Sequence, residues 1–342
     1  MGKTTIKDVA REAGVGIATV SRVINGNYPV SDAVRQRVQT AISQLNYRPD
    51  GIARSLKVQK TFLVGVVIAD LSNSFFMQLV KGIEKTLSSS GYSIVIADHE
   101  ENPRKEQQII EMFLEKKVDA IITTTCQTEA CYFEQLRKTN VPIIFVDRLI
   151  DGLDIDTVIE DNEANSYDLV SHLIACGHSR IGVITGDTRV HTSRSRYLGY
   201  IKALQDHGLQ PDPRLTVHGH SIESYDAVRT MLASLSPDTW PSAIFATNNK
   251  RAESVLRACM DLGIAVPDTI SVASYGNISL PWLFSLKLTH VEQDLVRIGQ
   301  KTGEMVLRKL ANPNSGYKEY TINSPIIYGN SVRVLTPEPD KK

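Results

Sequence analysis

The chain has 342 residues, enough for two or three domains of ordinary size. Its content of 42% hydrophobic and 22% charged residues excludes a disordered or fibrous protein. No apolar run reaches the roughly 18 residues that span a bilayer, and the start of the chain lacks the apolar stretch of a secretory signal. The four cysteines are too few and too scattered for a disulfide framework. We therefore expect a cytoplasmic protein that is not attached to a membrane.

The formal net charge is zero, but the charges are unevenly distributed along the chain. Residues 1–60 contain ten Lys and Arg residues and four Asp and Glu residues, so this segment carries a net charge of +6 and the remainder −6. A basic segment ahead of an acidic body favours a polyanion as the partner of that segment alone. Charge by itself is equally compatible with a basic surface that has no partner.

The first 48 residues are predicted to form three short helices. The stretch Thr5–Asp8 has the form of a capping box and is followed by an apolar face at helical spacing. Gly14 permits a tight turn before a second helix over 17–25, and a third helix starts at Ser31. Two helices joined by a glycine turn, with a third behind them, predict an all-α helix-turn-helix head over residues 1–48, whose second helix recognises DNA.

The rest of the chain, from about Thr61, alternates between apolar runs suited to strands and amphipathic helical stretches. Near-continuous apolar strands that alternate with helices indicate parallel sheets covered on both faces. The expected fold of this body is α/β, with two doubly wound parallel-sheet lobes. The predicted strands are 62–70, 92–100, 118–125 and 141–148 in a first half, and 180–187, 215–220, 241–249 and 270–277 in a second half.

Three segments of the head carry a family resemblance: TIKDVAREAGV (5–15), ATVSRVINGN (18–27) and LNYRPDGIARSL (45–56). They closely resemble the head of the lactose/galactose repressor family, and the resemblance continues through the whole chain. It implies a periplasmic-binding-protein-like body whose lobes the chain connects three times, near 160–165, 289–293 and 322–325. The implied domains are a helix-turn-helix domain over 1–48, a hinge helix or linker over 49–60, an N-terminal lobe over 61–161 and 291–322, and a C-terminal lobe over 162–290 and 323–338.

The resemblance assigns DNA contacts to the head. Arg22 would donate a bidentate pair of hydrogen bonds to guanine, whereas Ile17 and Ala18, at the family's base-reading positions, would contact thymine methyl groups. Gly16 stands where the family usually has Ser, which weakens the start of the recognition helix. Thr5, Thr19, Ser21 and Asn25 are expected to anchor phosphates, and Ser31 completes the DNA-binding residues of the head.

The segment Pro49–Leu56 is either a plain linker or, as the resemblance implies, a hinge helix that orders only on operator DNA in a dimer. Leu56 matches the residue that the family wedges into the minor groove, and Ala53 lies on the same segment. Gly51 lowers helix stability by roughly 1 kcal/mol relative to Ala, which suits a helix that forms only with DNA. We expect this segment to contact the operator.

Ligands of open α/β sheets bind beyond the carboxyl ends of the strands. Positions of this kind match the effector pocket of the resembling family, and Arg196 matches the arginine that clamps the effector. The predicted effector-binding residues are Asn73, Phe75, Asp147, Arg148, Arg196, Asn248, Asn249, Tyr275, Asn277 and Gln293.

Two departures from the family pattern favour an anionic effector. Asn249 stands where the family usually has Asp, and Gly276-Asn277 stands where it usually has a pair of acids. A pocket that keeps Arg196 and loses carboxylates favours a carboxylate or phosphate group, such as that of a sugar acid, held in a bidentate pair. A neutral sugar or nucleoside, bound through other groups, stays open as the alternative.

Other function classes find little support in the sequence. His218 and His220 lack zinc-ligand spacing, and there is neither a G-x-S-x-G elbow nor a Gly-rich phosphate loop. No enzyme, catalytic residue, metal or cofactor is therefore expected. A secreted solute-binding protein would need a signal peptide.

The expected function is sequence-specific DNA binding by a transcriptional regulator, most often a repressor of a catabolic operon. A small effector would change the relative orientation of the lobes and thereby the hinge helices on operator DNA. The tail after Val334 is short and broken by prolines, unlike a heptad coil. We therefore expect a homodimer and not a dimer of dimers.

Overall fold

The structure is a computed structural model that describes residues 4–25, 29–47, 60–219, 224–278 and 285–335, with Asn25 described without its side chain. The chain divides into two compact units, Met1–Thr61 and Phe62–Lys342. The predicted hinge segment, with Ala53 and Leu56, lies outside the described residues.

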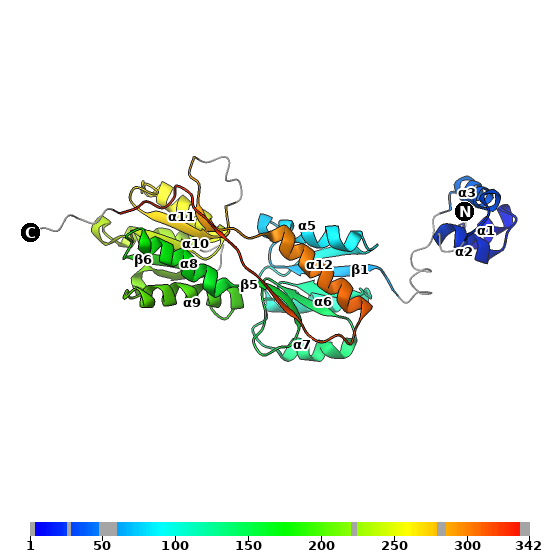
Figure 1. Ribbon diagram of the computed structural model, residues 1–342, viewed down its shortest axis with the longest axis horizontal. Helices are drawn as coiled ribbons and strands as arrows, with labels where there is room; N and C mark the ends of the chain where they lie inside the picture. Colours follow the sequence, from blue (N-terminus) through cyan, green and yellow to red (C-terminus); the bar gives the residue numbers. More distant parts are fainter. Residues whose placement is uncertain (1–3, 26–28, 48–59, 220–223, 279–284, 336–342) are drawn as a thin grey trace, which may run out of the picture. The chain divides into compact units, whose positions relative to one another are not determined.

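The first unit contains the helices α1 (Ile6–Glu12), α2 (Ile17–Asn25) and α3 (Asp32–Gln44) (Figure 1). Gly14 has φ +62°, the left-handed conformation that the tight turn between α1 and α2 requires. Ser31 is the N-cap of α3, so this helix begins one residue later than predicted. The predicted helix-turn-helix head is confirmed, and its core consists of Val9, Ala10, Ala13, Val20, Val38 and Ala41.

The second unit contains two six-stranded sheets (Figure 1). In the first sheet the strand order is β11-β5-β4-β3-β1-β2, and every pair is parallel. Its strands are β1 (Leu63–Ile68), β2 (Ser93–Asp98), β3 (Ala120–Thr123), β4 (Ile143–Val146), β5 (Asp156–Glu160) and β11 (Glu319–Ile322).

Helices cover both faces of the first sheet. On one face, α5 (Ser74–Ser88) and α12 (Leu295–Ala311) pack against inward-facing strand residues such as Val66. On the other face, α6 (Pro103–Glu115) and α7 (Cys131–Leu136) pack with its neighbour Val67. Successive strand residues point to opposite faces, so the apolar run of β1 supplies both cores of the first lobe.

The second sheet has the strand order β12-β10-β9-β8-β6-β7. The helices α8 (Asn162–Ala175) and α9 (His191–Asp206) cover one face, and α10 (Ser224–Ser234) and α11 (Asn249–Asp261) cover the other. The predicted pair of doubly wound lobes is confirmed. The strands are β6 (Ile181–Thr185), β7 (Thr216–His218), β8 (Ala243–Ala246), β9 (Ser271–Tyr275), β10 (Thr289–Val291) and β12 (Ile326–Ile327).

The chain passes between the two sheets three times: from β5 to α8, from β10 to α12, and from β11 to β12. One strand departs from the expected parallel arrangement, because β12 pairs antiparallel with β10. The reason is the path of the chain: β10 leaves the second sheet, whereas β12 enters it from the first through a short connection. Four strands were not predicted from the sequence: β5 and β11 of the first sheet, and β10 and β12 of the second.

Candidate functional site

The exposed side of α2 carries the residues that we predicted to read bases. Ile17 is 45% exposed although it is large and apolar, and Ala18 and Arg22 are exposed as well. Thr19 and Ser21 are half-buried beside them. The opposite side of the helix buries Val20 completely, so the geometry presents the predicted base-reading residues outward. Ser31 is exposed at the start of α3.

Thr5 begins α1 with the predicted capping box. Its backbone N–H and its hydroxyl donate to Oδ2 of Asp8, over 2.9 and 2.7 Å respectively. Both hydrogen bonds lower the pKa of Asp8, that from the Thr5 hydroxyl more than that from the backbone N–H. Because the Thr5 hydroxyl proton is already donated, the predicted phosphate contact of Thr5 requires it to leave Asp8.

Gly16 starts α2 without a side-chain cap. Its carbonyl oxygen accepts from the N–H groups of Thr19 and Val20, at 2.9 and 3.2 Å. An ideal Cβ on Gly16 would meet no atom within 4 Å. The serine that the resembling family has at this position would therefore fit here.

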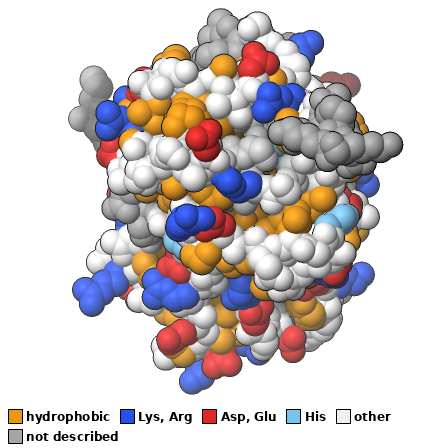
Figure 2. Space-filling model, turned by 90° about the vertical axis from the view of Figure 1, so that its left-hand side faces the viewer, with side chains coloured by type: hydrophobic (Ala, Val, Ile, Leu, Met, Phe, Trp, Pro, Cys, Tyr) orange, Lys and Arg blue, Asp and Glu red, His pale blue; other side chains and the backbone are white. Residues whose placement is uncertain are grey.

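On the face of the second unit that Figure 2 draws, side chains of both charges are mixed. On the outer end of the second lobe, blue and red side chains alternate with hydrophobic ones (Figure 2). The net positive charge of residues 1–60 thus belongs to the segment that carries the helix-turn-helix. This distribution agrees with DNA binding through the head.

A cavity of about 470 Å³ lies between the two lobes. The carboxyl ends of β1 and β4 and the start of α5 line it from the first lobe, and the starts of α9 and α11 line it from the second. Eight of the ten residues predicted to bind effector line the cavity. They are Asn73, Phe75, Asp147, Arg148, Arg196, Asn248, Asn249 and Gln293.

The other two predicted residues, Tyr275 and Asn277, lie outside the cavity wall. Tyr275 is fully buried beneath Arg196, whose Cζ lies 3.7 Å from the centroid of the tyrosine ring. Its hydroxyl accepts from Nδ2 of Asn165 over 3.1 Å. Asn277 accepts from the backbone N–H of Ile278. Tyr275 thus influences the cavity through Arg196, by stacking and cation–π attraction.

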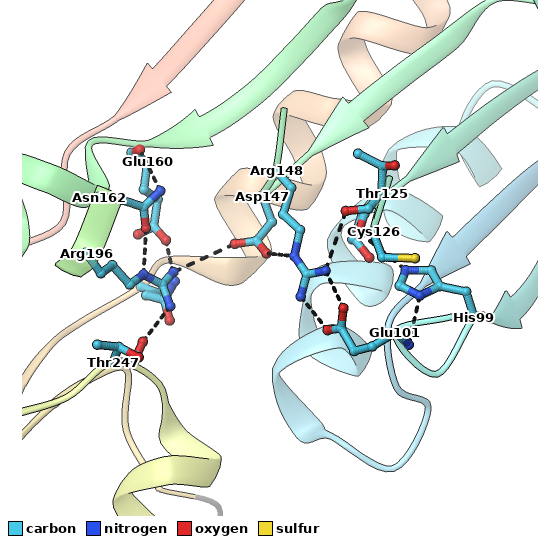
Figure 3. A network of polar contacts seen from close by, with 12 residues as sticks. His99, Glu101, Thr125, Cys126, Asp147, Arg148, Glu160, Asn162, Arg196 and Thr247 are labelled. Atoms are coloured by element: carbon cyan, nitrogen blue, oxygen red, sulfur yellow. Dashed lines mark hydrogen bonds and ion pairs between the residues drawn. The ribbon is translucent and has the colours of Figure 1, made fainter. Parts of the chain in front are cut away.

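Arg196 is held rigidly at the cavity wall (Figure 3). Its Nε donates to Oδ1 of Asn162 over 2.7 Å, and its Nη1 donates to the carbonyl oxygen of Thr247 over 2.8 Å. Its Nη2 lies 3.9 Å from Oδ1 of Asp147. A guanidinium has five N–H donors, so Nη2 and the second N–H of Nη1 are left to bind a ligand.

Arg148 pairs with Glu101 in the first lobe (Figure 3). Its Nη1 and Nη2 donate to the two carboxylate oxygens over 2.8 and 2.6 Å. Burial by itself raises the pKa of Glu101, but the charge and hydrogen bonds of Arg148 outweigh burial and lower this pKa to about 2. Glu100 and Glu101 both have left-handed φ values, of 51° and 57°, so the pair stabilises a strained loop.

Asp147 joins the two arginines across the lobes. It follows β4 with a left-handed φ of 66°, and its carboxylate lies 3.7 Å from Nε of Arg148 and 3.9 Å from Nη2 of Arg196. Figure 3 shows it between the two guanidinium groups. The result is a continuous row of alternating charges, Glu101–Arg148–Asp147–Arg196, from the first lobe to the second.

Glu160 connects the three crossovers. It lies at the end of β5 and is 3% exposed, and its carboxylate accepts from Nε2 of Gln293 and from Oγ of Ser324. These three residues belong to the first, second and third crossover. Burial raises the pKa of Glu160, against the hydrogen bonds and the charge of Arg196. The effector cavity and the lobe connections therefore share one polar network.

Gly276 explains part of this arrangement. Its φ is +84°, and an ideal Cβ there would lie 2.7 Å from Oε1 of Gln293. The acid that the resembling family usually has at this position would collide with Gln293 as it is placed here. The departure at Gly276 is thus coupled to the hydrogen bond between Gln293 and Glu160.

A second contact links the lobes directly. Oδ1 of Asn73, the N-cap of α5, accepts from the N–H of Phe75 over 3.1 Å and from Nδ2 of Asn249 over 3.0 Å. Asn249 is another departure from the family pattern. Because Oδ1 already accepts from Phe75, the residue at position 249 must be a donor to make this bond.

Arg251 is a cavity residue that the sequence analysis missed. It lies in the first turn of α11, is 7% exposed and lines the cavity. Its Nη2 donates to the carbonyl oxygen of Gly219 over 2.9 Å. Its position in the sequence could have indicated this role. It lies two residues after Asn249, at the start of a helix that follows a strand whose carboxyl end faces the cavity.

No candidate metal or membrane feature emerges from the described part of the chain. It contains no cluster of three His, Cys, Asp or Glu residues that suits a metal ion, and no helix long and apolar enough to cross a membrane. The ring of His218 contacts Tyr197, with centroids 5.5 Å apart, whereas His220 lies outside the described residues.

A helix-turn-helix head and a two-lobed body around a polar cavity define a DNA-binding regulator with an effector-binding domain. Residues 5–50 match the model of the bacterial regulatory proteins of the lacI family, and residues 61–328 match that of the periplasmic binding proteins and sugar binding domain of the LacI family. The chain therefore belongs to the LacI family of bacterial transcriptional regulators, as the resemblance implied.

Individual relatives agree with this assignment. The chain is 31% identical over 332 residues to the HTH-type transcriptional repressor PurR of Photobacterium profundum, covering 97% of this chain and 99% of that protein. It is 34% identical over 297 residues to catabolite control protein A of Priestia megaterium, covering 86% and 89%. The lac repressor dimer bound to operator and the anti-inducer ONPF has the same fold, with a TM-score of 0.85 at 24% identity over 97% of this chain and all of that one. Because these relatives are transcriptional regulators, the protein is not an enzyme, as expected.

Proposed function

We propose that this protein is a homodimeric, cytoplasmic repressor of a catabolic operon, and that a small anionic sugar derivative, in the first instance a sugar acid, controls its affinity for operator DNA. The observation that carries the effector class is the geometry of Arg196. Its guanidinium is oriented by Asn162, Thr247 and Tyr275, and it keeps N–H donors for the cavity. A planar fork of donors is suited to a carboxylate or phosphate group.

The same cavity supports a second candidate effector, a neutral sugar or nucleoside. Asp147 lines the cavity 3.9 Å from Arg196, and Glu101 and Asp187 line it as well. Carboxylates accept hydrogen bonds from hydroxyl groups and repel anions. The cavity wall therefore contains more carboxylates than the departures at Asn249 and Gly276 suggested. An experiment decides between the anionic and the neutral candidate effector.

For the DNA side, we propose that two heads bind a pseudo-palindromic operator, with the residues presented by α2 in the major groove. Effector in the cavity would compete with the contact between Asp147 and Arg196 and change the angle between the lobes. Because the three crossovers meet at Glu160, such a change would act on the hydrogen bonds that Gln293 and Ser324 donate to its carboxylate. A coupling of about 1–3 kcal/mol is typical of such regulation.

Calorimetric titration of the full chain with sugar acids, sugar phosphates and neutral sugars tests the effector class. We expect an anion to bind most tightly, and the variant Arg196→Met to lose this binding at least about tenfold, as removal of a charged hydrogen-bonding pair implies. Arg194→Met, on the same helix but paired with Asp151, is the matched control. If a neutral sugar binds most tightly, the second candidate effector is correct and the sugar acid is wrong.

The regulator itself is tested separately. Operator sequences are selected from random duplexes, and the affinity of the full chain is measured by fluorescence anisotropy with and without the effector. Analytical ultracentrifugation at the same concentrations gives the oligomeric state, for which we expect a dimer. A monomer bound to a single half-site would contradict the proposal.

A further inference from the structure

Arg251 differs from the other three arginines of the cavity in its charge partners, and one of these, Arg189, pairs with Asp187. Arg148 pairs with Glu101, and Arg196 lies beside Asp147. Within the described part of the chain, Arg251 makes no ion pair, and its Nε has no hydrogen-bond partner. Its one acceptor among the described residues is the carbonyl oxygen of Gly219. A buried cation without an ion-pair partner is costly, because it has lost water and gained no opposite charge in direct contact.

Arg251 remains a cation at neutral pH. Burial, together with the nearby charges of Arg196 and Arg148, lowers its pKa to about 10 against the opposing charge of Glu101, and this value is still well above 7. Among the described residues, the site therefore holds a positive charge that makes no ion pair. A ligand with a negative charge would supply what is missing.

Donors around Arg251 are arranged for an oxyanion. An ideal Cβ on Gly186 would lie 2.5 Å from Nη2 of Arg251 and 2.6 Å from Oγ of Ser193, so the guanidinium and the hydroxyl flank the same point. Ser193 lines the cavity in the first turn of α9, a helix of 16 residues. The N-cap of that helix, Val190, makes no side-chain cap hydrogen bond. A guanidinium, a hydroxyl and a helix N-terminus together form a polar cradle for a negative group.

We propose that Arg251 and Ser193 form an anion subsite at the second-lobe end of the cavity, which receives the carboxylate or phosphate group of the effector. This inference rests on the proposed function and deepens it, because it names the residue that decides between charged and neutral ligands. Arg196 binds the effector beside Asp147, whose carboxylate offsets the charge of its guanidinium. Arg251 provides the preference for a negative charge.

The test compares the full chain with the variant Arg251→Met, which keeps an unbranched apolar stem and removes the charged guanidinium. Arg257→Met is the matched control, because Arg257 lies on the same helix and its side chain is 66% exposed. The first probe is inorganic phosphate at constant ionic strength, with chloride as the reference anion. We expect phosphate to raise the melting temperature of the wild type and of Arg257→Met, and to leave that of Arg251→Met unchanged. If phosphate stabilises all three proteins equally, or none of them, the subsite is wrong.

The second probe is a set of matched ligands measured by calorimetry: D-glucuronate and D-glucose 6-phosphate against D-glucose, and D-galacturonate against D-galactose. In the wild type and in Arg257→Met, we expect one anion to bind at least about tenfold more tightly than its neutral partner. In Arg251→Met this preference falls to about threefold or less. Whether the acid or the phosphate shows the preference identifies the source of the negative group.

The possible results separate the two proposals. An anion preference that persists in Arg251→Met overturns the subsite and leaves the proposed function standing. Equal binding of anions and neutral sugars by the wild type overturns both. The melting temperature without ligand provides a check on structure: removal of an uncompensated buried charge should leave it unchanged or raise it. If the melting temperature of Arg251→Met decreases strongly, and Arg251→Lys and Arg251→Gln both keep the preference for anions, Arg251 has a purely structural role.

Discussion

At the scale of residues, the position of each side chain in α2 decides what it can do on DNA. Arg22 is exposed, so we expect it to read a guanine. Arg22→Ala should lower the affinity for a selected operator by about 5- to 150-fold, corresponding to about 1–3 kcal/mol, and leave the affinity for a scrambled duplex nearly unchanged. Fluorescence anisotropy with the two duplexes measures both values. Equal losses on both would mean that Arg22 contacts a phosphate.

The ion pair between Glu101 and Arg148 predicts a change in stability. Removal of one partner of a fully buried ion pair lowers the free energy of unfolding by about 3–5 kcal/mol. Because the side chain of Glu101 is 33% exposed, the effect should be smaller here. We expect Glu101→Gln to lower the free energy of unfolding by about 2 kcal/mol at pH 7. Urea denaturation measures this value. Glu100→Gln is the control, because Glu100 is 70% exposed and its pair with Lys105 should contribute about 1 kcal/mol or less.

The same pair predicts a pH dependence. The pKa of Glu101 is lowered to about 2 in the folded state, below its ordinary value. Its stabilising contribution is therefore fully present above the unfolded pKa and is lost as the pH falls through the folded value. Between about pH 5 and pH 2, the free energy of unfolding of the wild type should fall more steeply than that of Glu101→Gln. Parallel curves for the two proteins would contradict the assignment.

At the scale of elements, close helix packing holds the first lobe together. Gly299 of α12 faces α5, and an ideal Cβ at this position would overlap the carbonyl oxygen of Leu79. We expect Gly299→Ala to lower the free energy of unfolding by about 1–3 kcal/mol through overpacking, measured by urea denaturation. Gly316→Ala is the control, because a Cβ there meets nothing within 4 Å. Equal effects of the two substitutions would show that α5 and α12 can separate without cost.

The second lobe uses the same device between α8 and α9. An ideal Cβ on Gly199 would overlap the carbonyl oxygen of Glu163. In each lobe, one face of the sheet is thus covered by two helices that pack closely at a glycine. These helices are α5 and α12 in the first lobe, and α8 and α9 in the second. The helix that contains Arg196 is fixed in this way.

At the scale of the whole molecule, the contacts across the cavity keep the two lobes in register. The bond from Asn249 to Asn73 is one of them, and Asn249→Asp would place a carboxylate opposite an oxygen that accepts from Phe75. We expect the backbone N–H groups at the start of α5 to exchange with deuterium about fivefold faster in this variant, as the loss of a hydrogen bond worth about 1 kcal/mol implies. Mass spectrometry of the exchanged peptides measures the rates.

The control for this variant is Asn140→Asp, at an exposed left-handed position that Asp tolerates. It should leave the exchange at the start of α5 unchanged. If Asn249→Asp also leaves it unchanged, the contact between Asn73 and Asn249 does not hold the lobes together.

By itself, the sequence determined the helix-turn-helix head, the alternation of strands and helices, and eight of the residues that line the cavity. These features follow from local periodicity, from the turn at Gly14 and from the rule that ligands bind at the carboxyl ends of parallel strands. Residues at the carboxyl end of a predicted strand, such as Asp147 and Asn248, could therefore be predicted to line the cavity. The strands β10 and β12 have only three and two residues and were not predicted.

Only the tertiary structure decided how the polar groups are paired. Glu160 and Ser324 are 164 residues apart in the chain, yet they share a hydrogen bond because the crossovers converge. Tyr275 lies beneath Arg196 instead of in the cavity wall, and Arg251 is buried without an ion pair to any described residue. The physical reason is that the burial of a charge and the identity of its partner depend on segments brought together from distant parts of the chain, which no local pattern records.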